Sequence, residues 1–321
     1  MSDASTYVED FLGRLKGELE PFAYSVSDLV ERYGRAYQDD AAFILRKLEE
    51  FAARHGHGLP YVLDLYLRFT EHTVEEYRLY GATGRYRYET GEPGGAIFPG
   101  GDFDLSYLYV LTASTALNRS RYEVYRHYRE AAREYLKPGG SFLEIGGGNC
   151  LDALFAGDFG RVEVYEVNEK SLVWQEILGL SGKVDLRVAT YDFEDSGRYD
   201  FVSMLEVLEH VSDPGEYLRG AHRALKDDGR AYLTFAIRMP QFDHLYHFKS
   251  VEQCRRLLSE SGFRVADDYC TISSYRPFDE AERWELADDP RYAVTYCCVA
   301  EKQQPEEADD LLREFNLSLD L

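Results

Sequence analysis

Apolar residues in the first 80 positions recur every three or four residues, which is the spacing of one helical face. Representative positions are Val8, Phe11, Leu12, Leu15, Ala42, Ile44, Leu45, Leu48, Leu63, Leu65, Leu67 and Phe69. This pattern predicts three or four amphipathic helices between residues 5 and 79. Residues 80–103 are rich in glycine and include Pro93 and Pro99, which predicts a long loop. A loop of this length is either a lid over a site or a disordered connector.

Helical spacing resumes over residues 105–117 and 121–136, and the second of these segments ends at the sequence KPGG. From residue 137 onward, short β-branched and apolar runs alternate with helical segments, which predicts a parallel sheet built from βαβ units. The last two runs, FRVADDY and RYAVTYCCVAEK, are expected to form an antiparallel pair. The predicted organisation is therefore a helical domain over 1–136, an α/β domain over 137–302 and an acidic tail over 303–321.

The balance of charge bears on the class of partner. The chain has 36 Lys and Arg against 58 Asp and Glu, a formal net charge of −22. Phosphate backbones and anionic lipid surfaces are repelled by such a surface, so nucleic acid and membranes are not expected as partners. A neutral or cationic small molecule is favoured. The pattern of charges does not indicate an oligomeric state.

The cysteines and the hydropathy pattern bear on the compartment. Five cysteines are present without a CxxC pair, which is typical of reduced thiols and not of a disulfide framework. The N-terminal residues lack the apolar core of a signal peptide, and no stretch of eighteen uncharged apolar residues follows. We therefore expect a soluble, cytoplasmic protein.

The strongest chemical signal is the sequence FLEIGGGNC at residues 142–150, a buried strand that leads into a glycine turn and then a helix. Gly146 and Gly148 allow a ligand to approach the backbone closely, and the helix N-terminus offers unpaired N–H groups. The next predicted strand ends at Glu166, about 20 residues on, where a carboxylate can accept both hydroxyls of a ribose. The third leads to Asp192 and Phe193, an acid and an aromatic ring that suit an adenine.

Together these motifs resemble class I S-adenosylmethionine-dependent methyltransferases over about residues 141–240. The sequence EVLEHV at 206–211 resembles the loop after the fourth strand of that family, and LKDDGR at 225–230 its approach to the fifth strand. The resemblance implies a Rossmann-like, mostly parallel seven-stranded sheet and S-adenosylmethionine as cofactor. The expected cofactor-binding residues are Glu144, Gly146, Gly147, Gly148, Glu166, Val167, Tyr191, Asp192, Phe193, Leu205 and Glu206. His210 is expected to shape its loop and not to act as a base.

Two positions depart from the family pattern. Asn149 follows the glycines where many relatives have a small residue, and Tyr191 precedes the acid where a smaller residue is usual. Asn149 either caps the following helix or meets the amino acid end of the cofactor, and Tyr191 either packs in the core or does the same. Both are candidate catalytic residues for that reason.

Histidines after the fifth predicted strand are candidates on the acceptor side of the site. His244 and His247 lie where this family often approaches its acceptor, and we count both among the candidate catalytic residues. They are three positions apart, but the sequence indicates no third ligand, so no metal is expected. Tyrosines near the domain junction are candidates for lining a pocket for a sulfonium or an amine, namely Tyr107, Tyr109, Tyr122 and Tyr125.

Three functions fit these residues. The first is methyl transfer from S-adenosylmethionine to an N, O or C nucleophile of a small molecule. The second is cyclisation of S-adenosylmethionine itself with release of methylthioadenosine, as in the azetidine-2-carboxylate synthases, which resemble methyltransferases in fold and have an extra helical N-terminal part. The third is binding of S-adenosylmethionine without turnover, because a fold does not guarantee catalysis.

Overall fold

The structure is a computed structural model that describes residues 6, 20–87, 102–157, 160–273 and 278–303. Its centre is a seven-stranded sheet in the order β3-β2-β1-β4-β5-β7-β6. The strands are β1 (Gly140–Ile145), β2 (Gly160–Glu166), β3 (Val184–Val188), β4 (Tyr199–Met204), β5 (Leu225–Ile237), β6 (Phe263–Ser273) and β7 (Ala293–Lys302). The first five run parallel, whereas β7 pairs antiparallel with both β5 and β6. The predicted mostly parallel, Rossmann-like sheet and its terminal antiparallel pair are both confirmed.

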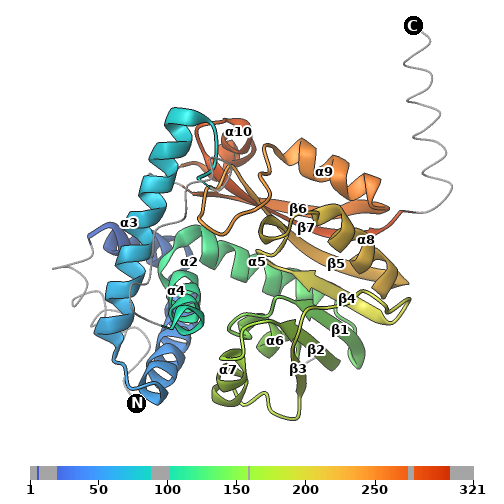
Figure 1. The fold of residues 1–321 in the computed structure, drawn as a ribbon, viewed down its shortest axis with the longest axis horizontal. Coiled ribbons are helices and arrows are strands. Elements are labelled where there is room, and N and C mark those ends of the chain that lie inside the picture. The colour runs from blue at the N-terminus through green and yellow to red at the C-terminus, as the bar shows by residue number, and fades with distance from the viewer. Residues whose placement is uncertain (1–5, 7–19, 88–101, 158–159, 274–277, 304–321) are drawn as a thin grey trace, which may run out of the picture.

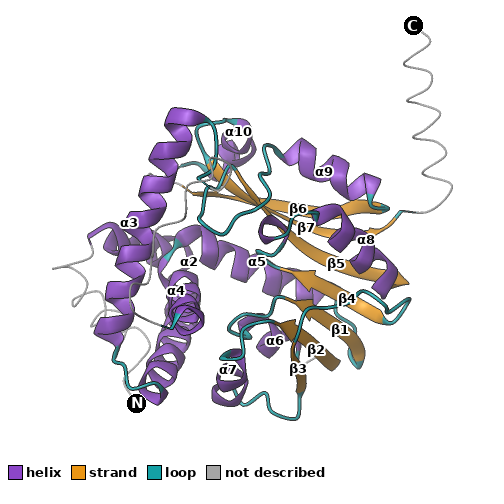
Figure 2. Cartoon of the chain, viewed as in Figure 1, coloured by secondary structure: helices purple, strands orange, loops and turns teal. Residues whose placement is uncertain are grey.

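Helices cover both faces of this sheet (Figures 1 and 2). One face packs against α5 (Arg119–Tyr135), α6 (Leu151–Ala156) and α7 (Ser171–Ile177). The other packs against α8 (Pro214–Ala224), α9 (Val251–Glu260) and α10 (Arg283–Asp288), whose apolar residues form a second core with β4, β5 and β7. The sequence pattern predicted α6, α7 and α8 but did not single out α9 or α10.

The N-terminal helices gather at one side of the sheet in Figure 1. They are α2 (Glu20–Arg54), α3 (Leu59–Thr83) and α4 (Phe103–Leu117). Gly34 interrupts α2 with a left-handed φ of 53°. The residues buried by these helices belong to the same hydrophobic core as Phe142, Val162 and Tyr232 of the sheet. The helical segment and the α/β segment therefore share one core, although they were predicted from separate sequence patterns.

The predicted loop at 80–103 is partly described. Tyr80–Thr83 form the last turn of α3, which Gly84 ends with a left-handed φ of 67°, and α4 begins at Phe103. Residues 88–101 lie outside the described residues, as do 304–321 of the predicted acidic tail. In the described part of the chain, no helix combines the length and the apolar character needed to cross a membrane.

Asp200 at the start of β4 ties three strands together at the edge opposite the glycine turn. Its carboxylate accepts hydrogen bonds from the Ser141 backbone N–H at 2.8 Å, the Ser141 hydroxyl at 2.9 Å and the Lys226 ammonium at 2.7 Å. Burial alone would raise the pKa of Asp200, but these hydrogen bonds outweigh it and lower the pKa to about 2. The charged form of Asp200 therefore stabilises the fold.

Replacing Asp200 with Asn is expected to cost about 1–2 kcal/mol of folding stability at pH 7, because the lysine loses its charged partner. A pKa lowered in the folded state contributes stability above the unfolded value of about 3.9 and loses it as pH falls toward 2. The difference between the wild type and D200N should thus shrink as pH falls below about 4. Urea unfolding at several pH values measures this difference in the free energy of unfolding. A difference that is constant with pH would contradict the stabilising role of the charged Asp200.

Candidate functional site

The glycine turn lies at the carboxyl end of β1 and is held in a shape that side chains would disturb. Gly146 and Gly148 have left-handed φ values of 79° and 48°. A Cβ atom at Gly146 would lie 2.5 Å from Val207 Cγ2, one at Gly147 2.3 Å from Val164 Cγ1, and one at Gly148 2.7 Å from Leu111 Cδ2. The turn therefore needs glycine both for its backbone conformation and for close packing.

Glu166, the acid at the end of β2, lies beside this turn. Its carboxylate accepts hydrogen bonds from the backbone N–H groups of Gly148 and Asn168, both at 2.8 Å. The Asn168 amide in turn donates to the carbonyl of Asp104 in α4 at 2.9 Å. Val167, between them, is exposed. The predicted ribose-binding acid is thus adjacent to the predicted methionine-binding turn, and α4 is fastened to both.

Asn149 faces α4 and the start of α6. Its side-chain amide donates to the Thr112 hydroxyl of α4 at 3.1 Å, while its oxygen accepts from the backbone N–H of Leu151 at 3.2 Å. The side chain is buried. Both polar ends of the Asn149 side chain therefore have protein partners, and its oxygen caps the helix N-terminus.

The segment after β3 holds the predicted adenine-side residues. Tyr191 is buried and donates to the Asp195 carboxylate at 2.9 Å, with its ring packed against Tyr165 and Phe193. Phe193, in a left-handed conformation, presses against α8 so closely that a Cβ at Gly220 would overlap its ring. Asp192 between them is exposed. Tyr191 thus packs in the core, whereas the side chain of Asp192 is accessible.

Glu144 and Asp152 lie beneath the glycine turn. Glu144 is buried in β1 and has a carboxylate oxygen without a hydrogen-bond partner among the described residues. Burial raises the pKa of Glu144 well above its usual value, and the neighbouring Asp152 raises it further. Burial also raises the pKa of Asp152, to about 7, although Arg121 and Arg129 oppose the rise. Glu144 thus belongs to the interior below the turn.

The segment after β4 forms a charged contact with α5. Leu205 is partly buried against the core. Glu206, in a left-handed conformation, forms an ion pair with Arg121, whose Nη1 lies 2.5 Å from Glu206 Oε2. Burial acts to lower the pKa of Arg121, but Glu206 and neighbouring groups outweigh it and raise the pKa. Arg121 therefore stays charged next to a predicted cofactor-binding residue. Sequence analysis did not identify Arg121, because nothing in its helix marks it as different from the other arginines.

A cavity of about 490 Å³ lies between the N-terminal helices and the carboxyl ends of β4 and β5. Most of its wall comes from α3, α4, the start of α5 and the segments that follow β4 and β5, and α2, the end of β6 and the start of β7 complete it. Tyr107, Arg121, Glu206, His210 and His244 are among the lining residues. The size suits a small organic molecule, and the wall mixes aromatic, apolar and charged groups.

Some of the candidate tyrosines and histidines line this cavity, and the others lie elsewhere. Among the four tyrosines, Tyr107 lines it, whereas Tyr109, Tyr122 and Tyr125 belong to the hydrophobic core. His244 lines it as well. His247 packs against Tyr86, with 3.9 Å between ring centroids, and against Tyr80. The structure therefore brings His244 to the predicted acceptor side and places His247 against the end of α3.

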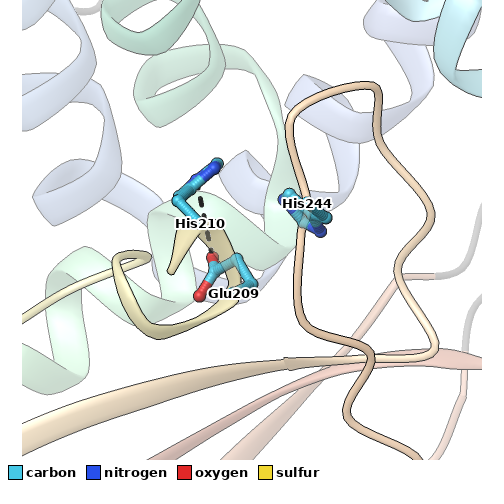
Figure 3. Close-up of side chains that lie close together, drawn as sticks. All are labelled: Glu209, His210 and His244. Atoms are coloured by element: carbon cyan, nitrogen blue, oxygen red, sulfur yellow. Dashed lines mark ion pairs between the residues drawn. The ribbon is translucent and has the colours of Figure 1, made fainter. Parts of the chain in front are cut away.

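His210 and Glu209 line the cavity beside His244. The three side chains are drawn in Figure 3. Burial acts to lower the pKa of His210, but Asp243 and Glu209 outweigh it and raise the pKa. Burial lowers the pKa of His244 well below its ordinary value, and His210 lowers it further. Sequence analysis did not identify Glu209, since it is one of two acids in EVLEHV and only the fold shows which one is fully buried.

The sheet order and the glycine turn after β1 form a Rossmann-like fold, and a known family matches this part of the chain. A family described as "Methyltransferase domain" matches residues 117–268. The match covers just under half of the chain, and this part is similar to a methyltransferase domain that uses S-adenosylmethionine as its cofactor.

Curated relatives include two bacterial enzymes named ubiquinone biosynthesis O-methyltransferase. That of Pseudomonas aeruginosa (strain UCBPP-PA14) is 33% identical over 109 residues, which are 32% of this chain and 47% of the relative. That of Bordetella bronchiseptica is 32% identical over 126 residues, or 37% of this chain and 52% of the relative. The chain thus spans about half the length of the curated relatives it matches.

Solved structures with a similar arrangement include an N-methyltransferase from Burkholderia thailandensis with bound 1,6-didemethyltoxoflavin and S-adenosylhomocysteine. It is 16% identical, with a TM-score of 0.44, and the match covers 62% of this chain and 88% of that one. A putative methyltransferase from Bacillus halodurans is 15% identical, with a TM-score of 0.44, and the match covers 56% of this chain and all of that one.

Proposed function

We propose that the protein transfers the methyl group of S-adenosylmethionine to an N, O or C nucleophile of a small molecule. The observation that carries this proposal is the cavity, which is lined by Glu206 after β4 and by residues of α3 and α4. A methyltransferase needs a second, enclosed volume next to its cofactor for the acceptor. The N-terminal helices supply the walls of that volume, which gives the helical segment a function.

The cofactor is proposed to lie along the carboxyl ends of β3, β2, β1 and β4, which are neighbours in the sheet. Its methionine end would meet the turn at Gly146–Gly148, its ribose Glu166, and its adenine Asp192. Because Glu166 already accepts two backbone hydrogen bonds, its carboxylate is held in place before the ribose arrives. Leu205 and Glu206 would then lie between the sulfonium and the cavity.

The cavity residues suit a reaction in which positioning supplies much of the rate. The sulfonium is a good leaving group, so an in-line approach by the acceptor and exclusion of water are the main requirements. Tyr107 presents an aromatic ring in the wall, and such rings attract a sulfonium or an amine by about 0.5–2 kcal/mol. The wall carries both Arg121 and Glu206, so the acceptor would meet both signs of charge.

Cyclisation of S-adenosylmethionine is the alternative that rested on Asn149 and Tyr191 as polar groups beside the amino acid end of the cofactor. The side chain of Asn149 is hydrogen-bonded to Thr112 and Leu151, and that of Tyr191 to Asp195. Neither side chain lines the cavity. The described residues therefore favour methyl transfer over cyclisation.

Identification of the nucleoside product separates the three functions. The full chain is incubated with S-adenosylmethionine alone and then with panels of small amines, phenols and other hydroxyl compounds, and the products are identified by mass spectrometry. We expect S-adenosylhomocysteine only when an acceptor is present. Methylthioadenosine formed from the cofactor alone would overturn methyl transfer in favour of cyclisation. Tight cofactor binding without product from any mixture would point to binding without turnover.

Filling the cavity should separate acceptor binding from cofactor binding. Val74 of α3 lines the cavity, so Val74→Trp is expected to raise the KM for the acceptor at least about 10-fold, while the Kd for S-adenosylmethionine stays within about 2-fold. Glu71→Trp, at an exposed position on the same helix, is the matched control and should change neither constant. Equal effects of V74W and E71W on the acceptor KM would contradict the assignment of the cavity.

A further inference from the structure

Glu209 has an unusual environment for a carboxylate. Its side chain is fully buried, and neither oxygen accepts a hydrogen bond from the residues that the structure describes. The side chain of His210 lies beside it, with Nε2 4.0 Å from Oε1. Buried carboxylates are normally paired or coordinate a metal ion, so Glu209 requires an explanation.

Two imidazoles lie against this carboxylate. Glu209, His210 and His244 each offer a ligand atom, and these atoms all lie within 4.8 Å of one another. Figure 3 shows that Glu209 and His210 come from one segment and His244 from another. Bonds of about 2.0–2.2 Å would bring the three atoms to within roughly 3–3.5 Å of one another, so small side-chain rotations are enough to complete the set.

The outer nitrogen of each ring is already fixed by a backbone carbonyl. His244 Nδ1 lies 2.7 Å from the carbonyl oxygen of Met239, and His210 Nδ1 lies 3.1 Å from that of Asp243. An Nδ1–H donated to a carbonyl leaves Nε2 as the nitrogen with a lone pair, which is how metal-binding histidines are commonly oriented. Both rings therefore present Nε2 to a ligand.

The two segments that carry these side chains are joined by their backbones. The carbonyl oxygen of Glu209 accepts hydrogen bonds from the N–H groups of Leu245 at 2.7 Å and Tyr246 at 2.9 Å. These bonds hold the turn η2 (Leu208–His210) against the segment after β5, and so keep His244 beside Glu209. A site whose ligands come from two bonded segments is preorganised.

We propose that Glu209, His210 and His244 bind a divalent transition-metal ion, with Zn²⁺ as the representative. Two imidazoles and one carboxylate are a ligand set suited to Zn²⁺, and three protein ligands leave a fourth position open. All three residues line the cavity, so the open position faces the volume assigned to the acceptor. Glu206 is not a ligand in this assignment, because Arg121 pairs with it.

The assignment differs from the sequence prediction of no metal, which considered only His244 and His247. His247 is not part of the cluster; the partners of His244 lie 34 and 35 positions earlier in the chain. The inference goes beyond the proposed methyl transfer and does not depend on it, because metal binding is measured without cofactor or acceptor. A cation at this place would also offset part of the negative charge contributed by Glu206, Glu209 and Asp243.

The test uses the full chain without an affinity tag, stripped with EDTA and then dialysed. Zn²⁺ is titrated by calorimetry, bound zinc is counted by mass spectrometry, and Co²⁺ is titrated as a spectroscopic probe. The variants are Glu209→Gln and His244→Gln, and the control is His55→Gln, which removes a histidine bonded only to its own helix carbonyl among the described contacts. We expect one tightly bound Zn²⁺ in the wild type and H55Q, and at least 10-fold weaker binding in E209Q and H244Q.

Thermal unfolding shows whether a variant that fails to bind is still folded. Without metal, E209Q should be at least as stable as the wild type, because the substitution removes an unpaired buried carboxylate. Added Zn²⁺ should then raise the Tm of the wild type and H55Q but not that of E209Q or H244Q. No zinc bound by the wild type, or equal binding by the wild type, E209Q and H244Q, would overturn the assignment.

Discussion

Replacing Arg283 with Met is expected to destabilise the protein by about 3–5 kcal/mol, the cost of leaving a buried charge without its partner. Arg283 and Glu123 are both almost fully buried, and Arg283 Nη1 lies 3.3 Å from the Glu123 carboxylate. Arg283 also donates to the Cys270 carbonyl and lies over the ring of Tyr269 at 4.4 Å. Without the guanidinium, Glu123 keeps the Tyr33 hydroxyl, at 3.1 Å, as a hydrogen-bond donor.

Urea unfolding of R283M measures this cost. Arg35→Met is the control, because Arg35 pairs with Asp39 on the surface, where such pairs contribute about 0–1 kcal/mol. The double variant with Glu123→Gln should recover part of the loss, since it also removes the buried charge. If R283M cost no more than R35M, the buried pair would not stabilise the junction between α5 and α10.

Replacing Gly146 with Ala is expected to cost about 2–5 kcal/mol of stability and to lower turnover about 100-fold. The stability loss has two sources, a left-handed φ of 79° and a Cβ only 2.5 Å from Val207. The loss of turnover follows because the turn would shift away from the cofactor, and a displacement of about 1 Å in a positioned site can cost about 100-fold.

A second glycine variant separates the cost of backbone strain from the cost of the steric contact with Val207. Gly179 has a similar φ of 69°, but a Cβ there would meet nothing within 4 Å. Gly179→Ala should therefore cost about 1–2 kcal/mol, the strain alone, and leave the Kd for S-adenosylmethionine unchanged. Calorimetric titration of cofactor into both variants makes the comparison. Equal cofactor affinity in G146A and G179A would contradict the placement of the methionine end at this turn.

The sheet could be predicted from the sequence because each strand of the parallel part is a short apolar run that can be recognised without knowing its neighbours in space. Apolar runs such as those around Leu143 and Val164 alternate with helical segments, and this alternation is enough to indicate parallel pairing. The carboxyl ends of parallel strands share one edge, so Gly146, Glu166 and Asp192 could be grouped before the structure was known. These are local signals combined with one rule of topology.

The cavity and the buried polar contacts could not be predicted in the same way. Arg121 pairs with Glu206 because of the way α5 packs against the segment after β4. In the same way, Glu209 lies beside His244 because of the way the segment after β5 packs against η2. Tyr107 and Tyr109 differ by two positions on one helix, yet one lines the cavity and the other lies in the core. Such outcomes depend on how helices dock, and periodicity within a single helix does not specify that.

Helix α4 touches both parts of the site. Leu111 and Thr112 contact the glycine turn and Asn149, while Tyr107, Leu111 and Ser114 line the cavity. A shift of α4 induced by one ligand therefore changes the affinity for the other ligand. This effect on affinity is reciprocal by thermodynamic necessity. The factor by which the cofactor alters affinity for the acceptor equals the factor by which the acceptor alters affinity for the cofactor, and this one helix would set its size.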